Sequence, residues 1–165
     1  VYQSYILESK NWGDFVIAKS FMFYSVLSVA TLFISGPLVD KFTSRKILPL
    51  MNIPSFFAML ILFYFDNQIS SYFLLGLMGI SNGLANVLGS STWAEIYGVK
   101  FIGSIKALTT SMMVFSTAFG TAVFGMIIDF GYSIEIIALV SLTYIAAANV
   151  LIVIFKRKIE PVLVK

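Results

Sequence analysis

Cysteine and histidine are both absent from the sequence, and only 12% of its 165 residues are charged. The lack of cysteine excludes a disulfide framework and thiolate chemistry. The lack of histidine excludes imidazole metal ligands, Ser–His nucleophile pairs and a histidine proton switch. We therefore expect no catalytic residue, no metal and no cofactor that would depend on either residue type.

Hydrophobic residues are abundant instead: they make up 59% of the chain and include 16 Phe and 8 Tyr. A soluble domain is closer to about half apolar and a quarter charged. A water-soluble fold of this size could not hide so much apolar surface, since much of its exterior must face water. The composition therefore predicts that the protein resides in a lipid bilayer.

The net charge of +3 does not indicate nucleic-acid binding. The basic residues lie between apolar runs and do not gather on one polar domain. That distribution is typical of a membrane protein whose loops face anionic lipid headgroups. We expect no nucleic-acid partner.

Five runs without a charged residue are long enough to cross a bilayer, which takes about 20 apolar residues in a helix. They show little period-2 alternation, so membrane β-strands are disfavoured, and a backbone without water must form α-helix. The sequence therefore predicts an all-α integral membrane protein with one membrane domain over 1–165. The five helices are expected near 16–38, 47–65, 72–93, 103–128 and 134–155.

The basic residues are distributed unequally between the two sides of these predicted helices. Only Lys10 and Lys19 lie on one side. The positive-inside rule places the other side in the cytoplasm, with the C-terminus. The N-terminus would then lie outside with no helix before it, which favours a fragment that lacks an N-terminal half. The nine residues on the cytoplasmic side are Lys41, Arg45, Lys46, Lys100, Lys106, Lys156, Arg157, Lys158 and Lys165.

The first cytoplasmic loop contains Gly36, Asp40, Lys41, Arg45 and Lys46. One interpretation is a basic loop that happens to contain one acid. The other is that Asp40 faces the positive N-terminal end of another helix and latches one conformation, while the bases hold the loop at the headgroups.

Two further segments have a pattern of their own. The second cytoplasmic loop has Glu95 at the end of one helix and Gly103 at the start of the next. A glycine-rich stretch follows over 120–132. The order, spacing and sidedness of these segments and the first loop resemble the C-terminal half of the major facilitator superfamily. The spelling of 40–46 is closest to its monocarboxylate and oxalate/formate branch.

The resemblance implies helices 8–12 of a twelve-helix secondary transporter, that is, part of its C-terminal six-helix bundle with a remnant of helix 7. It implies alternating-access transport of a small solute, with or without a coupling ion, in the plasma membrane, together with the missing N-terminal half. Anion carriers of the named branch place a basic residue in the middle of helix 8 or 11. The windows 20–39 and 107–128 contain none, which argues against a carboxylate substrate.

A membrane scaffold and an intramembrane enzyme are two other functional classes to compare with this pattern. A membrane scaffold or assembly subunit with five helices would share the composition but would not need the loop motifs. The chain lacks the residues that an intramembrane enzyme would need. Zinc and rhomboid-type proteases need histidine, and aspartyl proteases need two carboxylates inside the membrane. Every acid here lies outside or at the rim of an apolar run, so we expect no enzyme.

The third predicted helix is the most polar. Asn82 and Asn86 are four residues apart and share a face, and Gly79 and Gly83 form a GxxxG pattern close to the same stripe. One interpretation is close helix packing with the amides bonding across the interface. The resemblance makes this helix 10, which lines the transport path, so the two asparagines are also candidates for the wall of a substrate cavity.

Small residues in the fourth predicted helix, Ser116 and Gly120, have the same two interpretations: helix packing or cavity lining. In the second predicted helix, Asn52 and Pro54 predict a local kink, where neighbouring groups satisfy the carbonyl that proline leaves free.

Overall fold

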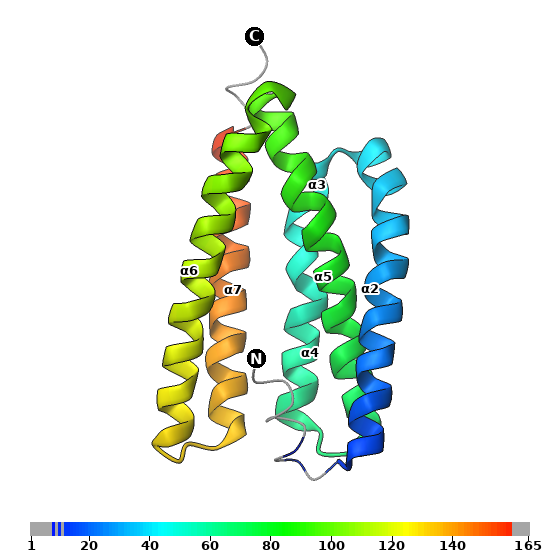
Figure 1. Cartoon of the computed structure of the whole chain (residues 1–165), viewed down its shortest axis with the longest axis vertical. Helices are drawn as coiled ribbons and strands as arrows, with labels where there is room; N and C mark the ends of the chain where they lie inside the picture. Colours follow the sequence, from blue (N-terminus) through cyan, green and yellow to red (C-terminus); the bar gives the residue numbers. More distant parts are fainter. Residues whose placement is uncertain (1–7, 9, 11, 160–165) are drawn as a thin grey trace.

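The computed structural model describes residues 8, 10 and 12–159, and the regular structure in this part of the chain is helical. Five stretches in it are long and apolar enough to cross a membrane, as predicted. The elements are α2 (Asp14–Phe42), α3 (Ser44–Ile47), the 3₁₀ helix η1 (Leu48–Asn52), α4 (Ile53–Tyr64), α5 (Gln68–Tyr97), the 3₁₀ helix η2 (Val99–Phe101), α6 (Ile102–Asp129) and α7 (Ile134–Ile159), shown in Figure 1.

The long helices run alternately up and down, so the loops collect at two ends of the molecule (Figure 1). We call one the basic end: α2 and α5 end there and α6 begins there. The other is the acidic end, where α4 meets α5 and α6 meets α7. Its acids include Asp66, Asp129 and Glu135.

The first span is longer than predicted, because α2 continues through Gly36 and Pro37 to Phe42. Gly36 does not adopt the left-handed conformation that would end a helix. That role falls to Thr43, which has φ 70°, and its N–H donates to the Val39 carbonyl at 2.9 Å. Of the residues predicted to form a loop after Gly36, those up to Phe42 are therefore the last turns of α2, and Arg45 and Lys46 lie in α3.

The second span is interrupted near the predicted kink, which makes it less regular than the single helix expected over 47–65. The chain forms a 3₁₀ helix over Leu48–Asn52 before α4 begins, with Pro54 in the first turn of α4. The Ser81 hydroxyl of α5 donates to the carbonyl of Met51. A side chain of the neighbouring helix therefore satisfies a backbone group at the break, as membrane helices require.

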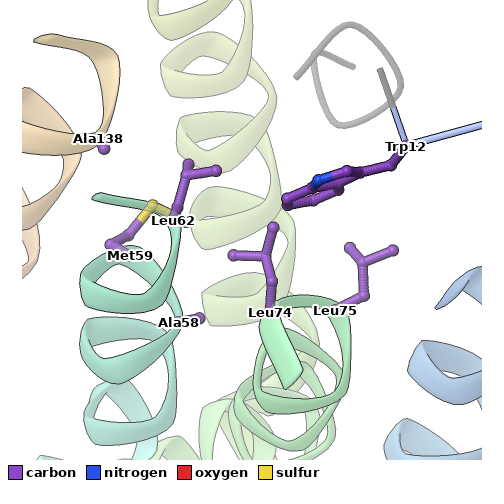
Figure 2. Close-up of a cluster of buried hydrophobic side chains, with 7 residues drawn as sticks. All are labelled: Trp12, Ala58, Met59, Leu62, Leu74, Leu75 and Ala138. Carbon is purple, nitrogen blue, oxygen red and sulfur yellow. The ribbon is translucent and has the colours of Figure 1, made fainter. Parts of the chain in front are cut away.

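The main core cluster lies near the acidic end, between Trp12 and the helices α4, α5 and α7. Figure 2 shows Trp12 lying over the side chains of this cluster. The indole N–H of Trp12 donates to the Asp66 carbonyl at 2.8 Å, and Lys10 Nζ donates to the Leu62 carbonyl at 3.2 Å and pairs with the Asp66 carboxylate. These bonds satisfy carbonyls at and just beyond the end of α4. The cluster consists of Trp12, Ala58, Met59, Leu62, Leu74, Leu75 and Ala138.

The helices are unequally embedded. α5 packs along α2 and α4, and α7 packs on α4. α6 has no buried residue in the described part of the chain, and its main contacts are with α5 and η2. In Figure 1 it meets α5 at the basic end and diverges from it toward the acidic end. Most of the surface of α6 is therefore free for lipid or for other helices.

Candidate functional site

The glycines of α5 bring it into close contact with α2. A Cβ added to Gly79 would overlap the carbonyl oxygen of Tyr24, and one added to Gly83 would lie 2.7 Å from both the Ser28 carbonyl oxygen and Thr31 Cβ. Side chains cannot approach so closely, so only glycine permits this distance between the two backbones. The GxxxG pattern therefore serves helix packing, as one of the two interpretations predicted.

Asn82 and Asn86 lie at the edge of this interface. Asn82 Nδ2 donates to Ser28 Oγ of α2 at 3.2 Å. Asn86 Nδ2 donates to the carbonyl oxygen of Asn82 at 2.9 Å and lies 3.4 Å from its Oδ1. Both asparagines are exposed, while Ser28 is buried. The pair thus bonds to its own helix and to α2 on one side and is open on the other.

The position of this pair along α5 determines its depth in the membrane. Asn82 stands at the middle of α5, which runs from Gln68 to Tyr97. If α5 crosses the bilayer, the two amides lie near the midplane, where an amide that faces lipid finds no hydrogen-bonding partner.

The candidates on α6 are not joined to this pair. Ser116 is exposed, and a Cβ added to Gly120 would meet no atom within 4 Å. The described residues show no hydrogen bond between either of them and Asn82 or Asn86. The packing that their small side chains predicted is likewise not seen in the described part of the chain.

Five predicted latch residues lie at the basic end. Gly36 is half-buried within α2 and has open space around it. Asp40, Lys41 and Lys46 are exposed, and the structure shows no hydrogen bond or ion pair between Asp40 and another described residue. Arg45 is the member of the set that makes a long-range contact.

That contact is with Glu95, at the end of α5. Glu95 Oε1 accepts a hydrogen bond from the backbone N–H of Ser44 at 2.9 Å. Arg45 Nη2 donates to the Glu95 carbonyl oxygen at 2.9 Å, and its Nε lies 3.8 Å from Glu95 Oε2. The side chains of Arg45 and Glu95 are 24% and 28% exposed. We call Ser44, Arg45 and Glu95 the basic-end clasp.

Sequence reasoning placed Arg45 and Glu95 in two separate loop motifs, and the clasp joins them across 50 residues. Gly103 opens α6 as predicted, with open space around it. The glycine that the turn requires is Gly98, whose φ of 77° ends α5. The signal in the sequence was the glycine itself at the end of a helical run, because glycine readily adopts the positive φ that ends a helix.

The acidic end has a cavity of about 360 Å³ that the sequence did not predict. Among the described residues, no group of three or more acidic, histidine or cysteine side chains could hold a metal ion. The cavity therefore has polar walls without a metal-binding set. Its lining residues are Lys10, Asp66, Ser133, Ile134 and Glu135.

Comparison with known proteins identifies the family. No curated protein and no solved structure gives a significant match to the chain. The model of one protein family, the Major Facilitator Superfamily, matches residues 1–164. That match agrees with the five membrane-spanning helices and covers nearly the whole chain. The chain belongs to the Major Facilitator Superfamily, a family of membrane transporters.

Proposed function

We propose that the chain forms helices 8–12 of a twelve-helix secondary transporter that moves a small solute by alternating access. The observation that carries this proposal is the exposed pair Asn82 and Asn86 in the middle of α5. Amides at this depth are stable where they face a water-filled path, and solute sites of such transporters lie near the midplane. α5 then lines the path, and the pair offers hydrogen bonds to the solute.

The rest of the transporter would cover what this chain leaves open. An N-terminal half would face the asparagine pair across the path. The exposed α6, with Ser116 and Gly120, would line the path or pack against helices of that half. If transport is coupled to protons, the proton carrier would lie in that half, because the five charge-free runs of this chain contain no carboxylate.

The solute of this half is proposed to be uncharged or cationic. The spelling of residues 40–46 favours the monocarboxylate and oxalate/formate branch, but 20–39 and 107–128 contain no basic residue that would pair with a carboxylate. Uptake of labelled lactate, formate and oxalate by the full-length protein tests this point. Saturable uptake of any of them that survives all substitutions in the N-terminal half would contradict it.

We propose that the basic end acts as a conformational latch on the cytoplasmic side of the plasma membrane. Within this chain the clasp of Glu95 with Ser44 and Arg45 holds the end of α5 to α3. Asp40 remains exposed, so its carboxylate is available to the N-terminal end of a helix in the other half. Lys41 and Lys46 would hold this end at the headgroups.

Cysteine labelling tests the topology on which this function depends. The chain has no native cysteine, so single substitutions give a clean background. We expect Lys46→Cys and Lys100→Cys to react with an impermeant reagent only from the cytoplasm, and Asn67→Cys and Ser133→Cys only from outside. All four positions are exposed. The five-span arrangement would be contradicted if a cytoplasmic position (46 or 100) were labelled from outside, or an external position (67 or 133) from the cytoplasm.

Substitution of the asparagine pair tests the path itself. We expect Asn82→Leu with Asn86→Leu to lower transport by the full-length protein about tenfold, the value of about 1.4 kcal/mol of lost hydrogen bonding. Uptake of the solute per inserted molecule is the measurement. Membrane insertion should be unchanged, because leucine suits a membrane helix.

Asn149→Leu is the matched control on α7. α7 packs on α4 and η1 and is not a main neighbour of α5 among the described residues, so Asn149 lies away from the asparagine pair. Transport by this variant should stay near the parent rate. Unchanged uptake by the double variant on α5 would remove the asparagines from the path.

A further inference from the structure

Three polar side-chain atoms at the basic end are buried without a hydrogen-bond partner among the described residues. They are Oγ of Ser44, Nε of Arg45 and Oγ1 of Thr92. Ser44 is fully buried and Thr92 is 7% exposed. A buried polar group without a partner destabilises a fold, and nearly all such groups in native proteins are bonded to protein or to ordered water.

The three atoms belong to one small region around Glu95. The backbone N–H of Ser44 bonds to Glu95 Oε1 at 2.9 Å, which places Ser44 beside that residue, while the Ser44 hydroxyl makes no bond to the carboxylate. Arg45 Nε lies 3.8 Å from Glu95 Oε2. Thr92 precedes Glu95 by three residues on α5 and therefore shares its face. All four residues belong to α3 or to the part of α5 near Glu95, and α3 packs on α5.

At 3.8 Å, Arg45 Nε and Glu95 Oε2 are too far apart for a direct hydrogen bond. A polar contact of this length is commonly bridged by a water molecule. A buried water usually makes about three hydrogen bonds to polar groups that otherwise lack a partner.

We infer that the basic-end clasp binds one structural water molecule between Arg45, Glu95, Ser44 and Thr92. The water accepts a hydrogen bond from Arg45 Nε and donates one to Glu95 Oε2. Its remaining donor and acceptor capacity serves the two hydroxyls, each of which can donate or accept.

The charges of the site favour water over an ion. A sodium ion would gain the three oxygens but would lie beside the Arg45 guanidinium. A chloride ion would gain donors from Arg45 and the hydroxyls but would lie beside the Glu95 carboxylate. Water both donates and accepts, so it alone satisfies the cation and the anion together. This inference concerns the clasp and does not depend on the proposed transport activity.

Removal of the Thr92 hydroxyl tests the inference, because the direction of the change in melting temperature decides the outcome. Thr92→Val keeps the shape of the side chain and removes Oγ1. If the hydroxyl bonds to the water, the variant should lower the apparent melting temperature of the full-length protein in detergent by about 2–4 °C. If the hydroxyl has no partner, valine is the better residue and the melting temperature should rise, which would overturn the inference.

Thr143→Val provides the matched control. The Thr143 hydroxyl donates within its own helix to the Leu139 carbonyl at 2.8 Å, and the residue is exposed. The same chemical change there should shift the melting temperature by less than about 1 °C. A shift equal to that of Thr92→Val would show that the substitution itself, and not the site, sets the effect.

A double variant tests whether one water serves both hydroxyls. Ser44→Ala should also lower the melting temperature, and Ser44→Ala with Thr92→Val should lower it by less than the sum of the two, because the water is lost only once. Additive shifts would contradict a shared water. The shifts should not change when sodium chloride is replaced by potassium gluconate, and a change would assign the site to an ion.

An experimental density map of the full-length protein provides a test that needs no variant. The inferred water predicts a peak within about 3 Å of both Arg45 Nε and Glu95 Oε2. A map that resolves other ordered waters and shows no peak there, or a direct bond between the two groups, would overturn the inference.

Discussion

Gly79→Ala is expected to prevent α2 and α5 from packing, with a cost in stability of about 3 kcal/mol or more. The added Cβ would overlap the Tyr24 carbonyl oxygen, which belongs to a backbone and cannot move aside as a flexible side chain can. Gly83→Ala should act in the same direction, against the Ser28 carbonyl and Thr31. The yield of monodisperse protein in detergent and its apparent melting temperature are the measurements.

The same helix offers the opposite result with the same substitution. A Cβ added to Gly89 would meet no atom within 4 Å, and Gly89 is exposed on α5. Gly89→Ala should therefore stabilise the helix by up to about 1 kcal/mol through its better helix propensity. Equal effects of Ala at 79 and 89 would show that the glycines do not set the distance between α2 and α5.

Glu95→Ala is expected to open the basic-end clasp. The variant leaves the Ser44 N–H and the Arg45 guanidinium without the carboxylate that accepts from one and pairs with the other. We expect a loss of stability of about 1–3 kcal/mol and faster proteolysis between α2 and α4. Glu95→Gln should fall between Glu95→Ala and the parent, because its amide oxygen can still accept from Ser44.

Glu135→Ala controls for the loss of a carboxylate in general. Glu135 is exposed in the first turn of α7 at the other end of the molecule, and the structure shows no ion pair that involves it among the described residues. Its removal should change stability by less than about 0.5 kcal/mol. A loss comparable to that of Glu95→Ala would mean that charge, and not the clasp, accounts for the effect.

The spans could be predicted because the bilayer imposes a simple rule on the sequence: apolar residues must continue for the thickness of the hydrocarbon core. The rule says less about where a helix ends. α5 begins at Gln68 and ends at Tyr97, beyond the predicted 72–93 on both sides, since a helix continues into the headgroup region. An irregularity near Pro54 was equally predictable, because proline acts locally on its own helix, but the sequence predicted a kink and not the 3₁₀ helix over Leu48–Asn52.

The contacts that build the candidate sites could not be predicted in the same way. The clasp joins Arg45 to Glu95, and the acidic-end contacts join Lys10 and Trp12 to Asp66, across more than 49 residues in each case. Such pairs leave no periodic signal in a single sequence, because each depends on which helices become neighbours. The asparagine pair was found because two positions four apart on one helix are a local pattern.

The unequal embedding of the helices bears on how the chain enters the membrane during synthesis. α5 has the lowest mean hydropathy of the five spans and the largest buried share, so it gains most from neighbours that cover its polar groups. Both of those neighbours, α2 and α4, precede it in the chain and are made first. α6, which lacks such cover in the described chain, is more hydropathic and can partition into lipid by itself. The order of the helices thus lets the translocon release α5, the most polar span, next to helices that are already in the bilayer.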